Sequence, residues 1–313
     1  MSFAPGEVWT ARAGVDRSGV VYHIDASYFI FRAYYSMPPD MVDGEGNATQ
    51  ALYGFARFLS DLLETVRPER IAVAFDQSLR SETSFRNTIY PAYKANRESP
   101  PEDLKRQFEL CREFCRHMGL AEFASDAYEA DDIIGTLAAR SRAAGLRNVL
   151  VTRDKDLSQL IRRGDVFWDY GGNVRYGYDD ICLKFGAIPE LIADFLALTG
   201  DSVDNIPGVP GVGKKTATEL FAVFGSLDDL YANIERVAAL SMRGAAAVAA
   251  KLTQHKDAAY LARRLTGIVC DIPLKASVDD LKLRRPDGAA LESFFDVHGF
   301  GTLLRRQARR IAG

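Results

Sequence analysis

The segment Val20-Val21-Tyr22-His23-Ile24-Asp25 is a short apolar run that ends in a carboxylate, and two later segments repeat this pattern. They are Ile71-Ala72-Val73-Ala74-Phe75-Asp76 and Val149-Leu150-Val151-Thr152-Arg153-Asp154. Short runs of β-branched and other apolar residues between polar segments are typical of buried strands. We therefore predict strands over residues 20–24, 70–75 and 148–152, and a weaker one over 165–168.

Helical patterns over residues 49–66, 101–119 and 129–144 separate these strands. Alternation of strands and helices predicts an α/β domain with a largely parallel sheet. From about residue 189 to 265 the strand signal disappears and helix-forming residues dominate. We expect an N-terminal extension over 1–18, an α/β core over 19–188, and a helical module with a C-terminal segment over 189–313.

The composition is that of a globular chain, with 47% hydrophobic and 26% charged residues among 313, which argues against a disordered or fibrous protein. The sequence contains no apolar run of 18 residues and no signal-peptide pattern at its start, so we expect a cytoplasmic protein. The four cysteines show no metal-binding spacing and are expected to be reduced thiols.

Nine carboxylates are concentrated in short motifs. With 39 basic and 42 acidic residues the net charge is −3, but without these nine the remaining 33 acids leave a net charge of +6. A basic chain with one acidic patch suits a metal site within a surface that binds a polyanion. The nine are Asp25, Asp76, Glu129, Asp131, Asp132, Asp154, Asp156, Asp201 and Asp204.

Any one of these acids has an ordinary structural explanation, because aspartates after strands often cap turns and acids favour the first turn of a helix. Three aspartates at the ends of parallel strands should nevertheless converge at one edge of the sheet. A set of oxygen ligands without His or Cys selects Mg²⁺ or Mn²⁺. Paired ions of this kind catalyse phosphoryl transfer, so the sequence predicts cleavage of a phosphodiester with two Mg²⁺ ions.

The glycine-rich segment 208–217 suggests a grip on the substrate backbone. It fails the P-loop pattern because Lys215 stands where Ser or Thr is required, and no strand precedes it. A helix–hairpin–helix turn fits better, in which backbone N–H groups and lysines hold a DNA phosphate without reading sequence. A purely structural turn is the alternative. The candidate DNA contacts here are Gly211, Gly213, Lys214, Lys215 and Thr216.

Cations and aromatic residues alternate between residues 80 and 116, where a solvated helix face would look similar. Aromatics interleaved with cations suit contact with single-stranded nucleic acid. The candidates are Arg86, Tyr93, Lys94 and Arg97, and Arg32 is a further candidate phosphate ligand.

Six motifs, taken in this order, resemble the 5′-nuclease (flap endonuclease) family, in particular the 5′→3′ exonuclease domain of bacterial DNA polymerase I and its stand-alone relatives. The resemblance covers residues 20–306. The motifs are Ile24-Asp25 through Tyr34, Ala74-Phe75-Asp76, Tyr93 through Arg97, Tyr128 through Asp132, Thr152 through Leu157, and Gly200 through Gly208.

The resemblance implies a PIN-like core, a helical arch over about 78–116 and a helix–three-turn–helix element. It implies that Asp25, Asp76, Glu129 and Asp131 hold the first metal, with Asp132 in or just behind that shell, and that the remaining four acids hold the second. Lys94 and Arg97 match a catalytic basic pair at the base of the arch, and Arg86 matches an arch position. The carbonyls of Val209 and Val212 match a K⁺ site.

Three residues depart from the family pattern: Ala26 and Arg153 replace glycines, and Val203 replaces a serine. Arg153 is the departure that can disturb the second metal site. The chain is thus expected to be a monomeric, Mg²⁺-dependent 5′ nuclease acting on DNA, with a separate DNA polymerase as a candidate partner. A non-catalytic DNA-binding scaffold and an RNA-cleaving PIN-like enzyme are the alternatives.

Overall fold

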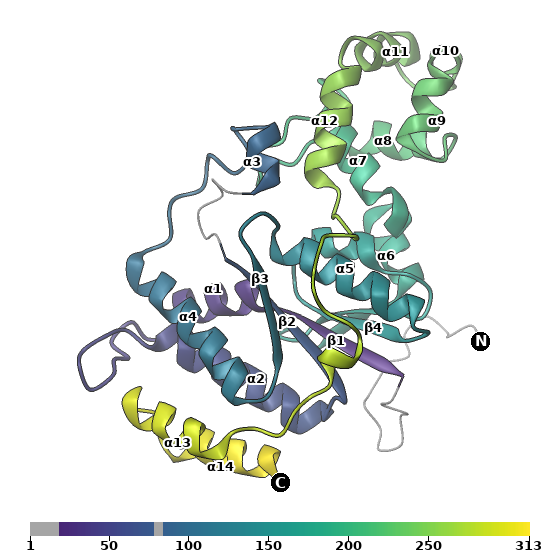
Figure 1. The fold of residues 1–313 in the computed structure, drawn as a ribbon. Coiled ribbons are helices and arrows are strands. Elements are labelled where there is room, and N and C mark those ends of the chain that lie inside the picture. The colour runs from purple at the N-terminus through teal and green to yellow at the C-terminus, as the bar shows by residue number, and fades with distance from the viewer. Residues whose placement is uncertain (1–18, 78–83) are drawn as a thin grey trace.

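The computed structural model describes residues 19–77 and 84–313, and its centre is a six-stranded sheet in the order β3-β2-β1-β4-β5-β6 (Figure 1). All pairs are parallel except β5–β6, which confirms the predicted α/β class. Two strands were not predicted, because β3 is half polar and β6 has only three residues. The strands are β1 (Val20–Asp25), β2 (Arg70–Asp76), β3 (Ala121–Ser125), β4 (Arg147–Val151), β5 (Val166–Asp169) and β6 (Val174–Tyr176).

Helices cover both faces of the sheet because its strands are apolar on both sides. Val20 and Ile24 of β1 face one core, which contains α1 (Ala26–Ser36), α2 (Gln50–Val66) and α4 (Glu102–His117). Val21 faces the other core, which contains α5 (Ala130–Ala143). The latter also includes the 3₁₀ helix η2 (Lys155–Leu160) and α6 (Tyr178–Phe185).

Gly54 allows α2 to lie close to α1, the helix that begins directly after Asp25. A Cβ atom at Gly54 would lie 2.5 Å from the Cβ of Ala33. We expect Gly54→Ala to lower the free energy of unfolding by about 1–3 kcal/mol, because the helices must move apart. Urea unfolding measures this, with Gly288→Ala as control, since a Cβ at Gly288 meets nothing within 4 Å. Equal effects of the two substitutions would contradict the prediction.

The predicted helical module is present as a group of helices beside the α/β core (Figure 1). It has its own hydrophobic core. The 3₁₀ helix η3 (Pro189–Leu191) leads into it from the α/β core. Phe195 and Leu198 of α7 pack with Leu265 of α12 in that core. Its helices are α7 (Ile192–Thr199), α8 (Lys214–Phe221), α9 (Leu227–Ala232), α10 (Ile234–Val237), α11 (Ala245–Gln254) and α12 (Lys256–Thr266).

The C-terminal segment does not belong to this module, contrary to the predicted division at 189–313. After α12 the chain returns to the α/β core through η4 (Asp279–Leu281), and Leu283 and Arg284 donate backbone hydrogen bonds to Glu69 and Gly119. Helices α13 (Gly288–Val297) and α14 (Thr302–Ala312) then pack with α2 and α4 (Figure 1). Apolar residues such as Leu291 and Phe295 bury this segment, so its physical domain is the core.

The basic helix α14 lies on the core surface with most of its cations paired. Arg305 binds Glu292 and Asp296, Arg309 binds Glu292, and Arg310 binds Glu64. These arginines attach the helix to the protein.

The predicted arch is shorter than residues 78–116. Leu104, Phe108 and Phe114 of α4 are buried in the main core, so residues 102–117 form a core helix. Within the expected span, α3 (Phe85–Ile89) and the turns at 91–97 remain, and residues 78–83 lie outside the described structure, as does the predicted extension 1–18. None of the described helices is long and apolar enough to cross a membrane.

Candidate functional site

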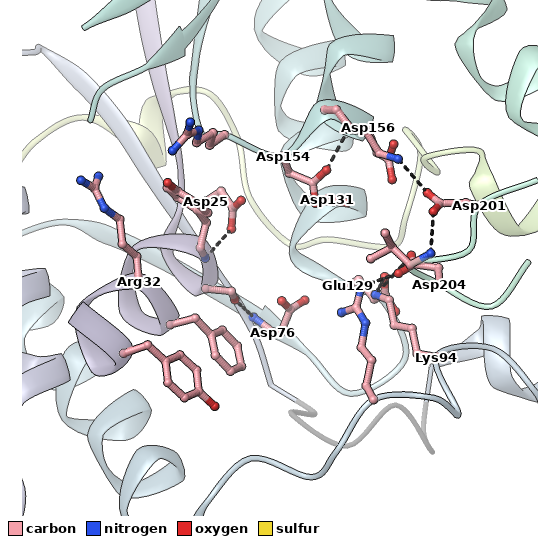
Figure 2. A pocket seen from close by; sticks show the side chains of 18 residues that line it. Asp25, Arg32, Asp76, Lys94, Glu129, Asp131, Asp154, Asp156, Asp201 and Asp204 are labelled. Carbon is pink, nitrogen blue, oxygen red and sulfur yellow. Dashed lines mark hydrogen bonds and ion pairs between the residues drawn. The ribbon is translucent and has the colours of Figure 1, made fainter. Parts of the chain in front are cut away.

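The carboxyl ends of the strands open into one cavity of about 620 Å³, and eight of the nine predicted acids line it. Figure 2 shows these acids around a common space, with Arg32 on the side of Asp25 and Lys94 on the side of Glu129 and Asp204. Asp132 is the exception. The eight are Asp25, Asp76, Glu129, Asp131, Asp154, Asp156, Asp201 and Asp204.

The carboxylates of Asp25 and Asp76 are fixed by helix starts. Asp25 caps α1, with its Oδ1 accepting from Tyr28 N at 3.2 Å and its Oδ2 accepting from Thr152 Oγ1 at 2.8 Å. Asp76 ends β2, and its Oδ1 accepts from Ala130 N, at the start of α5, at 2.8 Å. The same α5 turn carries Glu129 and Asp131, so local capping brings four acids to one edge of the sheet.

The other four acids come from the loops after β4 and α7. Asp154 caps η2, and its Oδ1 accepts from Asp156 N at 2.9 Å. Asp201 begins a tight loop, closed by backbone hydrogen bonds with Ile206, that carries Asp204 back toward the cavity. The helical module therefore contributes the last two carboxylates.

Crowding of like charges is visible in the acid–base properties of the site. Burial and the neighbouring Asp154 raise the pKa of Asp25 to about 7. The same two causes raise the pKa of Asp156 to about 7. The pKa of Asp131 lies well above its usual value because the group is buried and faces Asp154, Asp25 and Asp76.

Lys94 and Arg97 partly neutralise the opposite side of the cavity. Lys94 Nζ donates to Glu129 Oε2 at 2.9 Å, and Arg97 donates to Asp204 Oδ1. Burial alone would raise the pKa of Glu129, but Lys94 and Arg86 outweigh it, so this pKa is lowered. Lys94 has a positive φ of 54°, a strained conformation that residues at functional sites often adopt. Its backbone N–H donates to Asp204 O at 3.0 Å, which ties this turn to the helical module.

The donor set of this cavity fits hard divalent cations. It offers only oxygen ligands, and their charges are mutually repulsive until a cation offsets them. Among the residues that the structure describes, no three acidic, histidine or cysteine side chains yet converge on one point. Several carboxylates are instead turned toward Lys94, Arg97 and Lys155. The oxygen chemistry of the lining residues is therefore what fits these cations.

Asp132 does not line the cavity, which favours the expected place just behind the first metal shell over a place in it. Its side chain is fully buried and receives two hydrogen bonds from Arg86, at 2.7 and 2.8 Å. The backbone N–H groups of Glu129 and Val269 donate to the same carboxylate. With all its acceptor sites engaged, Asp132 supports the ligand helix from behind.

The structure does not support the predictions that Arg86 and Tyr93 contact DNA, because each residue is only 2% exposed. Arg86 binds Asp132 and also donates to the backbone oxygens of Leu265 and Gly267. The Tyr93 hydroxyl donates to Glu129 and Asp204. From the sequence alone, a basic or aromatic residue that contacts nucleic acid cannot be distinguished from one that is buried in the protein.

The glycine segment forms the expected turn before a helix. Val212 N donates to Val209 O at 2.9 Å, and Gly211 has φ +79°, so residues 209–212 form a tight turn. Gly213 caps α8, and Lys214 and Lys215 are exposed, as a DNA contact requires, while Thr216 is half-buried. The Val209 carbonyl, one of the two expected at a K⁺ site, accepts this one hydrogen bond, and a Cβ at Gly211 would lie 2.3 Å from Lys251 Nζ. An ammonium thus lies against this turn.

Sequence reasoning missed several cavity residues. Lys155 binds Asp201 at 3.2 Å, and Tyr28, Phe31 and Tyr35 form an aromatic wall near Arg32. The helical spacing of 28, 31, 32 and 35 is the signal that could have revealed that wall. Lys251 could not have been found, because it lies 40 residues from the turn that it contacts.

Comparison with known proteins agrees with this architecture. Residues 20–186 match the family described as 5′-3′ exonuclease, N-terminal resolvase-like domain, and residues 187–289 match 5′-3′ exonuclease, C-terminal SAM fold. The chain is 36% identical to DNA polymerase I of Rhizobium leguminosarum over 97% of its own length. It spans only about 30% of that relative.

Solved structures share the fold. The flap endonuclease of bacteriophage T5 in a complex with DNA and metal ions matches 93% of this chain and 97% of its own, with a TM-score of 0.61 and 17% identity. The catalytic core of Rad2 with a DNA substrate matches 94% and 92%, with a TM-score of 0.56 and 18% identity. Together, the two matched domains and the acidic cavity between them show that this chain belongs to the 5′-3′ exonuclease family.

Proposed function

We propose that this chain hydrolyses DNA phosphodiesters at free 5′ ends and 5′ flaps with the help of two Mg²⁺ ions, leaving 5′-phosphate products. The observation that supports this proposal most strongly is that eight carboxylates from both domains line one cavity. Divalent ions held there would activate water and stabilise the leaving oxygen. Mn²⁺ shares this ligand preference and is expected to substitute.

In this function the acids would bind the metal ions, and the cations beside them would bind the phosphate. Asp25, Asp76, Glu129 and Asp131 would hold one ion, and the acids of the β4 and α7 loops would hold the other. Lys94 and Arg97 would leave Glu129 and Asp204 when the ions bind and become free to bind the transferred phosphate. The ion pairs of Lys94 and Arg97 with these acids would in this way keep both cations beside the cavity.

Duplex DNA would lie on the turn at 209–213 and the start of α8, where exposed backbone N–H groups and Lys214 and Lys215 face solvent. Such contacts read the phosphate backbone and not the bases. Lys251 Nζ adds positive charge beside Gly211, and the carbonyls of Val209 and Val212 would hold a K⁺ ion at the same turn. We also propose that the protein is a cytoplasmic monomer and that it acts together with a separate DNA polymerase.

The test compares single-stranded, nicked, gapped and 5′-flap DNA, each with and without Mg²⁺. We expect cleavage only with the ion, fastest at the junction of a flap, and a 5′-phosphate on the product. A matched RNA flap tests the RNA-cleaving alternative, which would show equal or faster cleavage of RNA. Binding of flap DNA with no cleavage in Mg²⁺ or Mn²⁺ would establish the scaffold alternative and reject the enzyme.

A further inference from the structure

Arg153 is the residue at the cavity for which the family pattern gives no role, because glycine is usual there. Its side chain lines the cavity and is 65% exposed. Its Nε lies 3.3 Å from Oδ2 of Asp169, and its guanidinium donates to the Tyr28 hydroxyl. Tyr28 also donates its backbone N–H to Asp25, and Asp169 is the only carboxylate of the described residues that forms an ion pair with Arg153.

A single turn between β5 and β6 seats two arginines. Asp169 at the start of this turn holds Arg153 and also accepts from Gly172 N at 3.0 Å. Two residues later, a Cβ at Gly171 would lie 2.1 Å from Nη1 of Arg32. Glycine at 171 is therefore what lets the Arg32 guanidinium lie against the turn. The two cations come from α1 and from the loop after β4, yet they share this support.

The charge on this side of the cavity is available to a ligand. Arg32 is exposed and forms no ion pair with any carboxylate of the described residues, and Arg153 has only Asp169. On the opposite side, Lys94 and Arg97 are paired with the acids themselves. Arg32 and Arg153 are therefore the cations of this cavity whose charge is not paired with one of the eight cavity acids, and an entering anion can bind them directly.

Guanidinium pairs match the several oxygens of a phosphate, and the neighbouring Tyr28, Phe31 and Tyr35 offer rings on which a base can stack. We propose that Arg32 and Arg153, seated by the turn at 169–173, form a phosphate clamp. It binds the phosphate of the substrate strand next to the bond to be cleaved. That this strand is the 5′ strand of a DNA substrate rests on the proposed function. The group bound is either an internal phosphodiester or a terminal 5′-phosphate.

The first experiment measures binding of fluorescent 5′-flap DNA in EDTA at several salt concentrations, and so does not depend on cleavage. We expect Arg153→Ala to weaken binding about 5- to 10-fold and to lower the salt dependence by about one phosphate contact. Gly171→Ala should weaken binding similarly by displacing Arg32. The matched control is Arg163→Ala, which removes a 75% exposed arginine outside the cavity that also pairs with an aspartate. Thermal unfolding checks that each variant is folded.

The second experiment identifies the phosphate. Flaps with one neutral methylphosphonate on either side of the cleavage site, and flaps with 5′-phosphate or 5′-hydroxyl ends, are bound by wild type and by Arg153→Ala. The linkage whose neutralisation weakens wild type but not the variant marks the phosphate in the clamp. Wild-type binding and salt dependence in Arg153→Ala would overturn the clamp, even if Mg²⁺-dependent cleavage is found. Absence of cleavage in the wild type would instead reject the proposed function and leave the binding result to decide the clamp.

Discussion

Replacing Asp131 by Asn is expected to abolish Mg²⁺-dependent cleavage while raising the melting temperature of the metal-free protein. Asp131 lines the cavity, and its pKa is raised because it is buried among Asp154, Asp25 and Asp76. Ionisation of Asp131 therefore opposes folding at every pH above the ordinary pKa of an aspartate, and the amide removes that cost without changing the shape. The same charge is needed to hold a cation, so the cleavage rate should fall on the order of 10³-fold.

Two measurements with opposite signs make this prediction specific. Thermal unfolding in EDTA should show a gain of a few °C for Asp131→Asn, and single-turnover cleavage of a flap in Mg²⁺ should show the loss. Asp126→Asn is the matched control, since Asp126 is an exposed aspartate in the loop that leads into α5 and lies outside the cavity, and both readouts should stay at wild-type values. A variant that loses stability and activity together would indicate that Asp131 is simply a structural residue.

Replacing Arg86 by Met is expected to lower the free energy of unfolding by about 3–5 kcal/mol, because Asp132 then remains buried without its counter-charge. The ion pair is almost inaccessible to water, with side chains 3% and 0% exposed. Arg86 also connects three segments of the chain. It lies in α3 and binds Asp132 of α5. It also donates to the backbone carbonyls of Leu265 and Gly267, at the end of α12.

Urea unfolding of a double-mutant cycle separates the pair from its packing. Asp132→Leu combined with Arg86→Met removes both charges, and we expect it to recover much of the loss seen in either single variant. Arg163→Met breaks an exposed pair with Asp179, 75% and 79% exposed, and should change stability by less than about 0.5 kcal/mol. Additive effects of the two buried substitutions would show that the groups do not depend on each other.

Strand positions and the acidic edge were readable from the sequence because they depend on local patterns. Runs such as residues 71–76 are apolar on both sides, as strands covered on both faces must be, and parallel strands place their final aspartates at one edge. The helical module was equally visible, since helix formers dominate residues 189–265 and Gly and Pro cluster only near 207–213. The strand β3 was missed because its partly exposed residues carry little of that pattern.

By itself, then, the sequence determined the α/β class, the family and the chemistry of the acidic cavity, since each follows from residue type and order along the chain. Only the tertiary structure decided what distant residues do to one another. It buried Arg86 against Asp132, returned the C-terminal helices to the core and seated Arg32 and Arg153 on one turn. A cation reads the same in a sequence whether it meets solvent, a phosphate or a buried carboxylate, and burial and long-range contacts alone distinguish these fates.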